Sequence, residues 1–228
     1  MAQYEVWEKE YKSPQLVTGG EKPQNDVLRF LKYFKRNYKK GLSGLEILDL
    51  GCGTGKNANY LASLGNNVSG MEISTTAIEL AKERAKQTNL IVNYKKRSIG
   101  KRYPFCDNSF DLALDITSSN SLTEHERKIY LQETHRVLKS GAYFFVRALC
   151  KEGDKNAKNL LKNSPGKEND TYIIKELGLI ERVFLLADFR KMYGKYFKIE
   201  KIFTRSGYTR FQGQSYKRVY LLAYLRKI

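Results

Sequence analysis

The residues with the clearest chemical potential form the run DLGCGTG (Asp49–Gly55), between an apolar segment and a segment with helical spacing. Glycine has no Cβ, so such a loop can turn sharply and bring its backbone close to a ligand. The start of the helix that follows offers unpaired N–H groups to a polar or anionic ligand. Glu72 ends a second apolar segment 21 positions after Gly51, where a carboxylate can accept hydrogen bonds from both hydroxyls of a ribose. These residues therefore predict a site for a ligand that contains ribose.

Two kinds of ligand bind such a loop, and the spacing of the glycines distinguishes them. A dinucleotide site uses G-x-G-x-x-G, but the position of the third glycine, counted from Gly51, is occupied by Lys56. The chain instead reads G-x-G-x-G, with Asp49 two positions ahead of the first glycine. A carboxylate there would repel a pyrophosphate, whereas it suits a ligand that carries an ammonium and a sulfonium. The pattern therefore favours S-adenosylmethionine as the cofactor.

Strand-like and helix-like segments alternate around this loop. Predicted strands cover residues 45–51, 66–73, 90–96, 109–116 and 142–149, and predicted helices cover residues 25–39, 57–64, 75–88, 123–138 and 185–196. Ser74 stands at an N-cap position, and Thr123 with Glu126 forms a capping box. Strands and helices that alternate at this rhythm predict parallel βαβ units.

Three segments of the chain resemble a known family. LEILDLGCGTGKNANYLASLGNNVSGMEIS resembles the first two signature segments of the class I S-adenosylmethionine-dependent methyltransferases. YPFCDNSFDLALDI and LQETHRVLKSGAYFFV resemble the family's fourth-strand and fifth-strand segments, in its small-molecule "methyltransferase domain" branch. The resemblance spans about residues 45–148 and implies an α/β fold. Its Rossmann-like sheet would have seven mostly parallel strands, the last one antiparallel, with helices on both faces. Residues 197–204 and 216–226, joined by residues 205–215, would be the last two strands.

The resemblance also implies which residues bind the cofactor. They are Asp49, Gly51, Cys52, Gly53, Glu72, Ile73, Ser98, Ile99 and Asp115. Glu72 would hold the ribose, and Cys52 would contribute its backbone. Ser98 would have to replace an aspartate that the family often places after the third strand. Asp115 would face the methyl-donor end, although a role as a turn cap remains open.

We interpret the 228 residues as one domain in three parts. Residues 1–44 would form a helical lid, residues 45–150 the cofactor-binding core, and residues 151–228 a substrate-side insertion followed by the final strands. The N-terminal segment often covers the cofactor in the resembling family. The aromatic residues of the lid could also serve packing alone.

Candidates for the acceptor side come from the lid, from the loop after the fourth strand and from the basic C-terminal third. They are Trp7, Tyr11, Ser118, Asn120, Arg147, Arg205 and Arg210. Ligands of open α/β sheets bind beyond the carboxyl ends of the strands, which favours the loop residues. No His–Asp pair stands at a recognisable spacing, so the sequence assigns no catalytic base, and the acceptor atom (O, N, S or C) stays open.

The charge of the chain bears on the acceptor. Lys and Arg number 41 against 24 Asp and Glu, a formal net charge of +17. Residues 45–150 hold 14 basic and 11 acidic side chains, whereas residues 151–228 hold 18 and 8. Our first hypothesis is therefore in-line methyl transfer to a small molecule, and an anionic acceptor fits this charge. The alternative is methylation of RNA or of a protein by means of the basic C-terminal third. DITSSN replaces the [DN]-P-P-[YF] motif of amino-methylating nucleic-acid enzymes, so we favour the first hypothesis.

Other classes of protein fit the sequence poorly. No apolar run approaches the roughly 18 residues that a membrane span needs, so we expect no membrane partner. Cys52, Cys106 and Cys150 form no CxxC pair, which argues against both a disulfide framework and a metal site. This cysteine usage fits a reducing compartment, and we expect a cytoplasmic protein. The intact glycine loop and Glu72 argue against a non-catalytic cofactor-binding scaffold.

Overall fold

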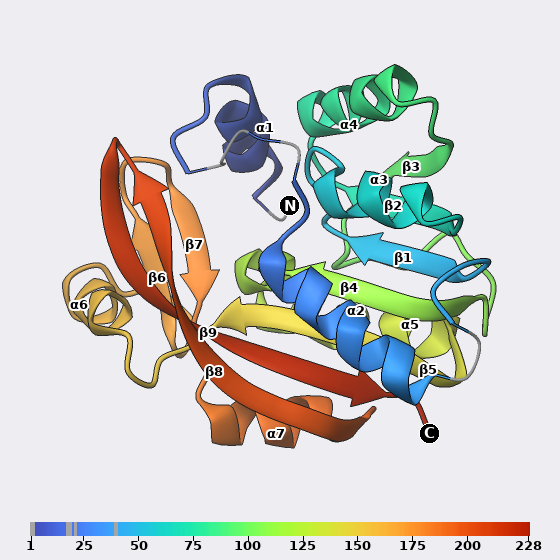
Figure 1. Ribbon diagram of the computed structural model, residues 1–228. Coiled ribbons are helices and arrows are strands. Elements are labelled where there is room, and N and C mark those ends of the chain that lie inside the picture. Colours follow the sequence, from blue (N-terminus) through green and yellow to red (C-terminus); the bar gives the residue numbers. More distant parts are fainter. Residues whose placement is uncertain (1–2, 17–19, 21, 39–40) are drawn as a thin grey trace.

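A seven-stranded sheet forms the centre of the protein. A computed structural model describes residues 3–16, 20, 22–38 and 41–228. The strands of the sheet are β1 (Glu46–Leu50), β2 (Asn67–Glu72), β3 (Val92–Lys96), β4 (Phe110–Ile116), β5 (Leu138–Leu149), β8 (Lys198–Phe211) and β9 (Gln214–Arg226). Their order is β3-β2-β1-β4-β5-β9-β8 (Figure 1). β1 to β5 are parallel, and β9 runs antiparallel to both of its neighbours. The predicted Rossmann-like sheet is therefore confirmed.

Helices cover both faces of this sheet. They are α2 (Asn25–Asn37), α3 (Lys56–Ser63), α4 (Thr75–Gln87), α5 (Glu124–Val137) and α7 (Leu186–Tyr193), whereas α1 (Tyr4–Lys12) lies beyond the carboxyl ends of the parallel strands. On the face covered by α2, α3 and α4, Phe30 stacks on Phe145 with ring centroids 4.8 Å apart. On the face covered by α5 and α7, Tyr130 packs near Phe144 at 6.1 Å. Cover from both sides explains why most residues of β4 and β5 are buried, and why β5 contains the apolar run Ala142–Val146.

The predicted helix starts are also confirmed. Ser74 Oγ accepts a hydrogen bond from the Ala77 amide at 3.1 Å, which caps α4. Thr123 and Glu126 form the predicted capping box of α5. The helix predicted at residues 25–39 is α2, and the last residue of that prediction, Lys39, lies outside the described residues.

The prediction of a loop at residues 205–215 was wrong. β8 and β9 continue through this segment as a long ribbon that turns at Gln212 and Gly213, whose φ values are 48° and 77°. Two consecutive positive φ values are typical of a tight hairpin turn whose twist matches that of the strands. The outer half of the ribbon alternates between partly buried and exposed residues, so it has no apolar stripe to mark it as strand.

The segment between β5 and α7 was predicted only as part of a substrate-side insertion. It contains α6 (Lys155–Asn163) and a hairpin of β6 (Thr171–Ile174) and β7 (Leu179–Arg182). Asp154 Oδ1 accepts from the Ala157 amide at 2.7 Å and so begins α6. We call residues 151–185, together with residues 204–220 of β8 and β9, the arm. Figure 1 shows the arm beyond the carboxyl ends of the parallel strands, with α1 between it and α4. In the described part of the chain, no helix is both long and apolar enough to cross a bilayer.

Candidate functional site

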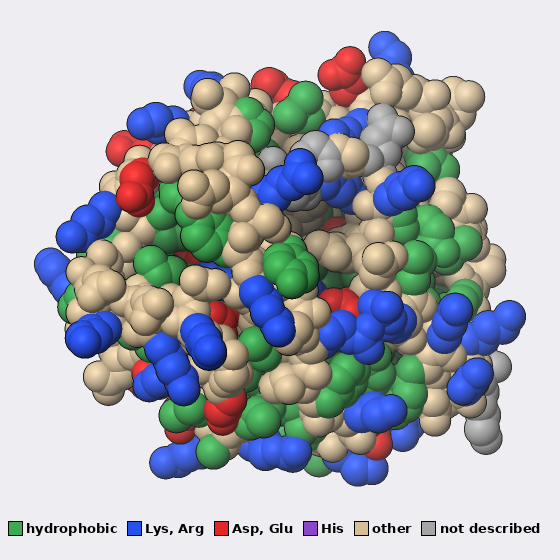
Figure 2. Space-filling model, turned by 60° about the vertical axis from the view of Figure 1, so that its left-hand side comes forward, with side chains coloured by type: hydrophobic (Ala, Val, Ile, Leu, Met, Phe, Trp, Pro, Cys, Tyr) green, Lys and Arg blue, Asp and Glu red, His purple; other side chains and the backbone are tan. Residues whose placement is uncertain are grey.

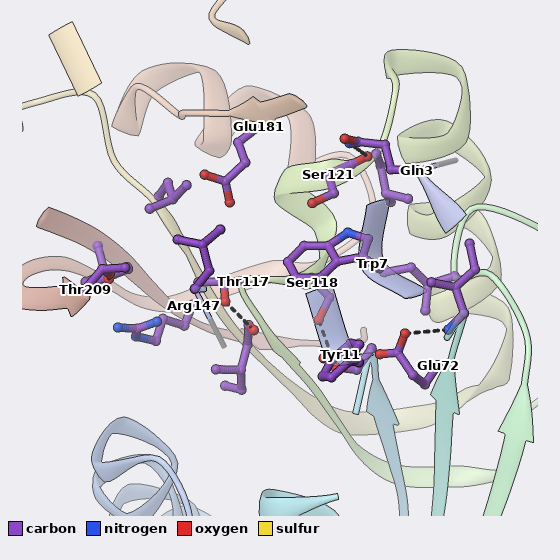
Figure 3. A pocket seen from close by; sticks show the side chains of 18 of the residues that line it. Gln3, Trp7, Tyr11, Glu72, Thr117, Ser118, Ser121, Arg147, Glu181 and Thr209 are labelled. Atoms are coloured by element: carbon purple, nitrogen blue, oxygen red, sulfur yellow. Dashed lines mark hydrogen bonds between the residues drawn. The ribbon is translucent and has the colours of Figure 1, made fainter. Parts of the chain in front are cut away.

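A cavity of about 320 Å³ lies at the carboxyl ends of the parallel strands. Residues that follow β1, β2, β3 and β4 line one half of it, and the end of β5 and the arm line the other half. Trp7 and Tyr11 of α1 also line it and lie between the two halves (Figure 3). The cavity therefore joins the glycine loop to the arm.

The glycine loop adopts a conformation that only glycine takes easily. Gly51 and Gly53 have φ values of +70° and +53°. The Gly51 amide donates to the Met71 carbonyl at 2.7 Å, which ties the loop to β2. A Cβ on Gly51 would collide with the side chain of Ser118, and one on Gly53 would lie 2.7 Å from the Tyr11 hydroxyl. The backbone of the loop is therefore closely covered, and a side chain on either glycine would fill that space.

Glu72 is fixed by three backbone amides. Its Oε2 accepts from Gly53 at 3.1 Å, and its Oε1 accepts from Ile73 at 2.7 Å and from Ser74 at 2.9 Å. Burial raises the pKa of this carboxyl, and the three hydrogen bonds act in the opposite direction. Glu72 lines the cavity, so a rigidly held carboxyl faces the position expected for a ribose.

Asp49 lies at the end of β1 and is 1% exposed. Its Oδ2 has no hydrogen-bond partner in the described part of the chain. Burial, together with the nearby Asp115 and Glu72 carboxyls, raises the pKa of Asp49 to about 7. Asp49 does not itself line the cavity. A buried carboxyl beside the loop with one unpartnered oxygen is nevertheless suited to a ligand that brings a positive charge.

The part of the cavity formed by the residues that follow β2 and β3 has the mixture of apolar and polar groups expected for an adenine site. Ile73, Ser98 and Ile99 all line the cavity, as does Arg97. Ser98 Oγ accepts from the Gly100 amide at 3.1 Å, and no described residue accepts its hydroxyl hydrogen. Two apolar side chains and one free hydroxyl can sandwich a flat base and hydrogen-bond to its edge.

Comparison with known proteins identifies the family. Residues 47–141 match the family model described as "Methyltransferase domain". The chain is 32% identical over 102 residues to an uncharacterized methyltransferase of Schizosaccharomyces pombe. The matched segment spans 45% of this chain and 70% of the relative. It belongs to the class I S-adenosylmethionine-dependent methyltransferases.

Two further likenesses extend this comparison. A ubiquinone biosynthesis O-methyltransferase of Pelagibacter ubique is 32% identical over 53% of this methyltransferase and 49% of its own length. The solved structure of an S-adenosylmethionine-dependent methyltransferase from Methanosarcina mazei is 26% identical, with a TM-score of 0.76, over 91% of this chain and 99% of that one. The cofactor, S-adenosylmethionine, supplies a methyl group on a positively charged sulfur.

The methyltransferase places four of the predicted acceptor-side residues on the cavity. They are Trp7, Tyr11, Ser118 and Arg147. α1 is held over the cavity by Gln3, just before its first residue, and by Glu8 near its middle. Gln3 Nε2 donates to the Ser121 carbonyl at 2.8 Å and to the Ile180 carbonyl of β7 at 2.7 Å. Glu8 accepts from the Ser74 and Thr76 hydroxyls at 2.7 Å. Burial acts to raise the pKa of Glu8, but these hydrogen bonds lower it to about 2.

Asp115 is not where the family resemblance implied. Its side chain is fully buried and does not line the cavity. Asp115 Oδ1 accepts from the Ser118 and Ser119 amides at 2.9 and 3.3 Å, and Oδ2 accepts from the Tyr130 hydroxyl at 2.6 Å. The carboxyl is therefore used to fix the 3₁₀ turn η1 (Ser118–Ser121), which carries Ser118 to the cavity.

Besides Asp49, five other predicted residues also lie off the cavity lining, and Gly53 of the glycine loop is one of them. Cys52 packs inward against Gly70 and leaves only its backbone at the loop, as expected. Asn120 is buried, and its Oδ1 accepts from the Leu149 amide at 3.3 Å. Arg205 pairs with Asp26, and Arg210 is exposed on the outside of the arm. Neighbouring residues of a strand point to opposite sides, so residue type alone could not show which of them face the cavity.

Sequence reasoning missed the residues that the arm contributes. They are Ile174, Glu181, Tyr208, Thr209, Arg218 and Tyr220. The short alternating runs TYII and LIER, on either side of Gly178, are a weak signal for the hairpin that carries the first two. Among the described residues, no group of three His, Cys, Asp or Glu side chains could hold a metal ion.

Glu72→Ala should weaken binding of S-adenosylhomocysteine, the product form of the cofactor, by about 10- to 100-fold. This range corresponds to the roughly 1.5–3 kcal/mol of a hydrogen bond to a charged group. Isothermal titration calorimetry measures the affinity, and Glu79→Ala on the exposed side of α4 is the matched control. Equal affinities in the two variants would exclude Glu72 as the ribose ligand.

The raised pKa of Asp49, about 7 against an ordinary 3.8, predicts a pH dependence. Below about pH 7 the Asp49 carboxyl of the free protein is protonated, whereas a bound ammonium favours its ionised form. Cofactor affinity should therefore increase as the pH rises through this range, and binding should release a proton. The folded, unliganded protein holds this proton more tightly than the unfolded chain does. Its free energy of unfolding should therefore fall as the pH rises from 3.8 through about 7.

Calorimetry in buffers of different ionisation enthalpy counts the released protons. Asp49→Asn should abolish the release and flatten the pH dependence of the affinity. Proton release that persists in Asp49→Asn would show that another group is responsible.

Proposed function

We propose that this methyltransferase transfers the methyl group to a small-molecule acceptor that carries an anionic group. The observation that supports this most directly is the cavity itself. It continues from Glu72 past Trp7 and Tyr11 to Arg147 and the arm, and the α1 segment bridges it through Gln3. A pocket of about 320 Å³, covered in this way, has the dimensions of a small-ligand site.

In this proposal the cofactor occupies the half with the glycine loop. Glu72 would accept from the ribose hydroxyls, Asp49 would favour the ammonium, and Ile73 with Ile99 would enclose the adenine. Gly51 and Gly53 would approach the amino-acid end through their backbone, with Tyr11 above them. The acceptor would then lie on the other side of Trp7.

Methyl transfer requires mainly that the protein position the acceptor relative to the cofactor. In-line transfer from a sulfonium needs an acceptor atom held opposite the carbon–sulfur bond, and such alignment can lower a barrier by about 7–11 kcal/mol at best. Trp7 and Tyr11 line the cavity between its two halves, where with both ligands bound they would help to exclude water. Ser118 Oγ donates to the Gly51 carbonyl at 3.2 Å, so the turn after β4 and the glycine loop are fixed relative to each other.

Arg147 supports an anionic group on the acceptor. Its Nε donates to Asp26 Oδ2 at 3.2 Å, and no described residue accepts from its two terminal nitrogens. The guanidinium lies 3.4 Å from the Tyr220 ring centroid, which holds it in place. Asp26 is shared with Arg29 at 3.1 Å and Arg205 at 3.7 Å, so positive charge is in excess here. A carboxylate or phosphate would balance it.

The alternative acceptor, RNA or a protein, is supported by the outer surface of the arm. Arg210 and Lys217 are exposed there, next to Tyr208, which lines the cavity but is 71% exposed. The basic side chains on this side of the molecule are nevertheless scattered among polar and apolar ones (Figure 2). Lys and Arg are expected on the solvent-facing side of a ribbon, so this pattern does not require a polymeric substrate.

A cytoplasmic location remains our expectation. Cys52, Cys106 and Cys150 are all free thiols, as in proteins of reducing compartments.

Arg147→Gln should raise the KM for 4-hydroxybenzoate about tenfold or more, because it removes a charge-assisted hydrogen bond. The KM for 4-hydroxybenzyl alcohol, which lacks the carboxylate, should change little. Arg205→Gln is the matched control, since Arg205 pairs with the same Asp26 but does not line the cavity. Equal effects of the two variants would contradict a direct contact between Arg147 and the acceptor.

Binding to single-stranded RNA at about 50 and 200 mM salt separates the two acceptor classes. A polymer substrate should show affinity that falls steeply with salt. We expect the methyltransferase to show no such binding and to methylate small probes in its absence. Salt-dependent binding together with methylation of the RNA would replace the small-molecule proposal.

A further inference from the structure

Glu181 of β7 is an acidic side chain that enters the acceptor half of the cavity. Figure 3 shows it on the opposite side of Trp7 from Glu72. Its Oε2 accepts a hydrogen bond from the Tyr172 hydroxyl at 2.7 Å. Its Oε1 has no hydrogen bond or ion pair with any described residue. One carboxyl oxygen is thus anchored and the other is free to meet a ligand.

A chain of buried polar groups holds Glu181 in this position. Arg218 Nη2 donates to the Tyr172 hydroxyl at 2.9 Å, and Arg218 Nε donates to Asp154 Oδ2 at 2.8 Å. Tyr172, Arg218 and Asp154 are 0%, 6% and 1% exposed. Burying polar groups is costly unless they form hydrogen bonds. Here a continuous series of hydrogen bonds joins Asp154, Arg218 and Tyr172 and ends at Glu181. Glu181, the last member of this series, keeps one carboxylate oxygen without a hydrogen-bond partner among the described residues.

The other titratable groups of the cavity are less suited to take a proton from an acceptor. Among the described lining residues, the acids are Glu72 and Glu181, and Glu72 is engaged by three backbone amides in the cofactor half. Tyr11 stays protonated, because burial and the nearby Glu72 raise its pKa well above the ordinary value. His135 lies instead near the rings of Tyr196 and Phe197.

The electrostatic surroundings of Glu181 also suit a base. Burial raises the pKa of its carboxyl, while the Arg218 charge and the Tyr172 hydrogen bond act against this rise. A carboxyl whose pKa lies above the ordinary range is a stronger base, yet the opposing groups favour its ionised form.

We propose that Glu181 is the catalytic base of this methyltransferase, and that the acceptor atom carries a proton, as in a hydroxyl or an amine. This inference rests on the proposed small-molecule function. The acceptor proton passes to Glu181 Oε1, and the acceptor's electron pair forms the bond to the methyl carbon. The carbon–sulfur bond breaks with its pair remaining on sulfur, which becomes neutral. The protonated Glu181 then returns its proton to water. Tyr172 is a positioning residue that orients the carboxyl.

Two acceptors that differ in one atom test the proposal. 4-Hydroxybenzoate must lose a proton during transfer near pH 8, whereas 4-mercaptobenzoate is already largely ionised there. Glu181→Gln should lower kcat about 100-fold or more with the phenol, the usual size of a general-base contribution. It should change kcat with the thiol less than about threefold. The phenol deficit should shrink as the pH rises and the phenol ionises in solution.

Controls separate a base from a structural role. Glu176→Gln, an exposed residue in the turn between β6 and β7, should leave both rates unchanged. Tyr172→Phe should lower the phenol rate less than Glu181→Gln does, with the same selectivity for the phenol over the thiol. The affinity for S-adenosylhomocysteine should be equal in all variants.

The possible failures are distinguishable. If Glu181→Gln lowers both rates equally, or lowers neither, Glu181 is not the base although the small-molecule function stands. If the wild-type protein methylates the thiol but neither 4-hydroxybenzoate nor 4-aminobenzoate, the requirement for a proton-bearing acceptor is overturned. If it binds S-adenosylhomocysteine but methylates no small probe, the proposed function fails, and the role of Glu181 with it.

Discussion

Arg218 and Asp154 form an ion pair whose side chains are 8% and 0% exposed, and the acceptor half of the cavity depends on it. Two charges taken out of water must be almost completely satisfied, and removing one partner of such a pair typically costs about 3–5 kcal/mol. Asp154 also accepts from the Ala157 and Val219 amides, so a single carboxylate joins the start of α6 to β9. Because β9 continues into the central sheet, where it pairs with β5 and β8, this contact ties α6 to a strand of that sheet.

The two halves of the cavity are built on different principles. The cofactor half is local: the glycine loop is tied to Met71 and Glu72 by backbone hydrogen bonds, and it lies within the βαβ unit that contains both. The acceptor half is assembled from distant segments, with Trp7 from α1, Arg147 from β5 and Glu181 from β7. Gln3 links two of these segments, since it bonds to Ile180 across 177 positions of the chain. The shape of the acceptor site is therefore a tertiary property.

This difference explains what could be predicted from the sequence. The glycine spacing and the caps at Ser74 and Thr123 depend on neighbours within a few residues, and the structure has both caps where they were predicted. Glu72 accepts a hydrogen bond from Gly53, 19 positions away, but its place at the end of β2 was also predicted. The arm depends on register and on long-range pairing. In the ribbon, Gly207 pairs with Arg218, whose neighbour Lys217 is exposed, and a shift of one residue would exchange the two sides. Arg210 was chosen for its charge, and only the folded ribbon shows that it is exposed and does not line the cavity.

Family membership constrains the two halves unequally. The matched family segment, residues 47–141, contains the glycine loop, Glu72 and the turn after β4, but it includes neither α1 nor any residue of the arm. The arm holds 11 basic and 6 acidic side chains, yet its inward-facing groups are nearly balanced, because Arg218 is matched by Asp154 and accompanied by Glu181. Net charge therefore describes the outer surface, whereas the acceptor meets a few fixed groups of both signs. Substitutions in the β6–β7 hairpin can change those groups without disturbing the cofactor half, so the choice of acceptor can diverge while methyl transfer is retained.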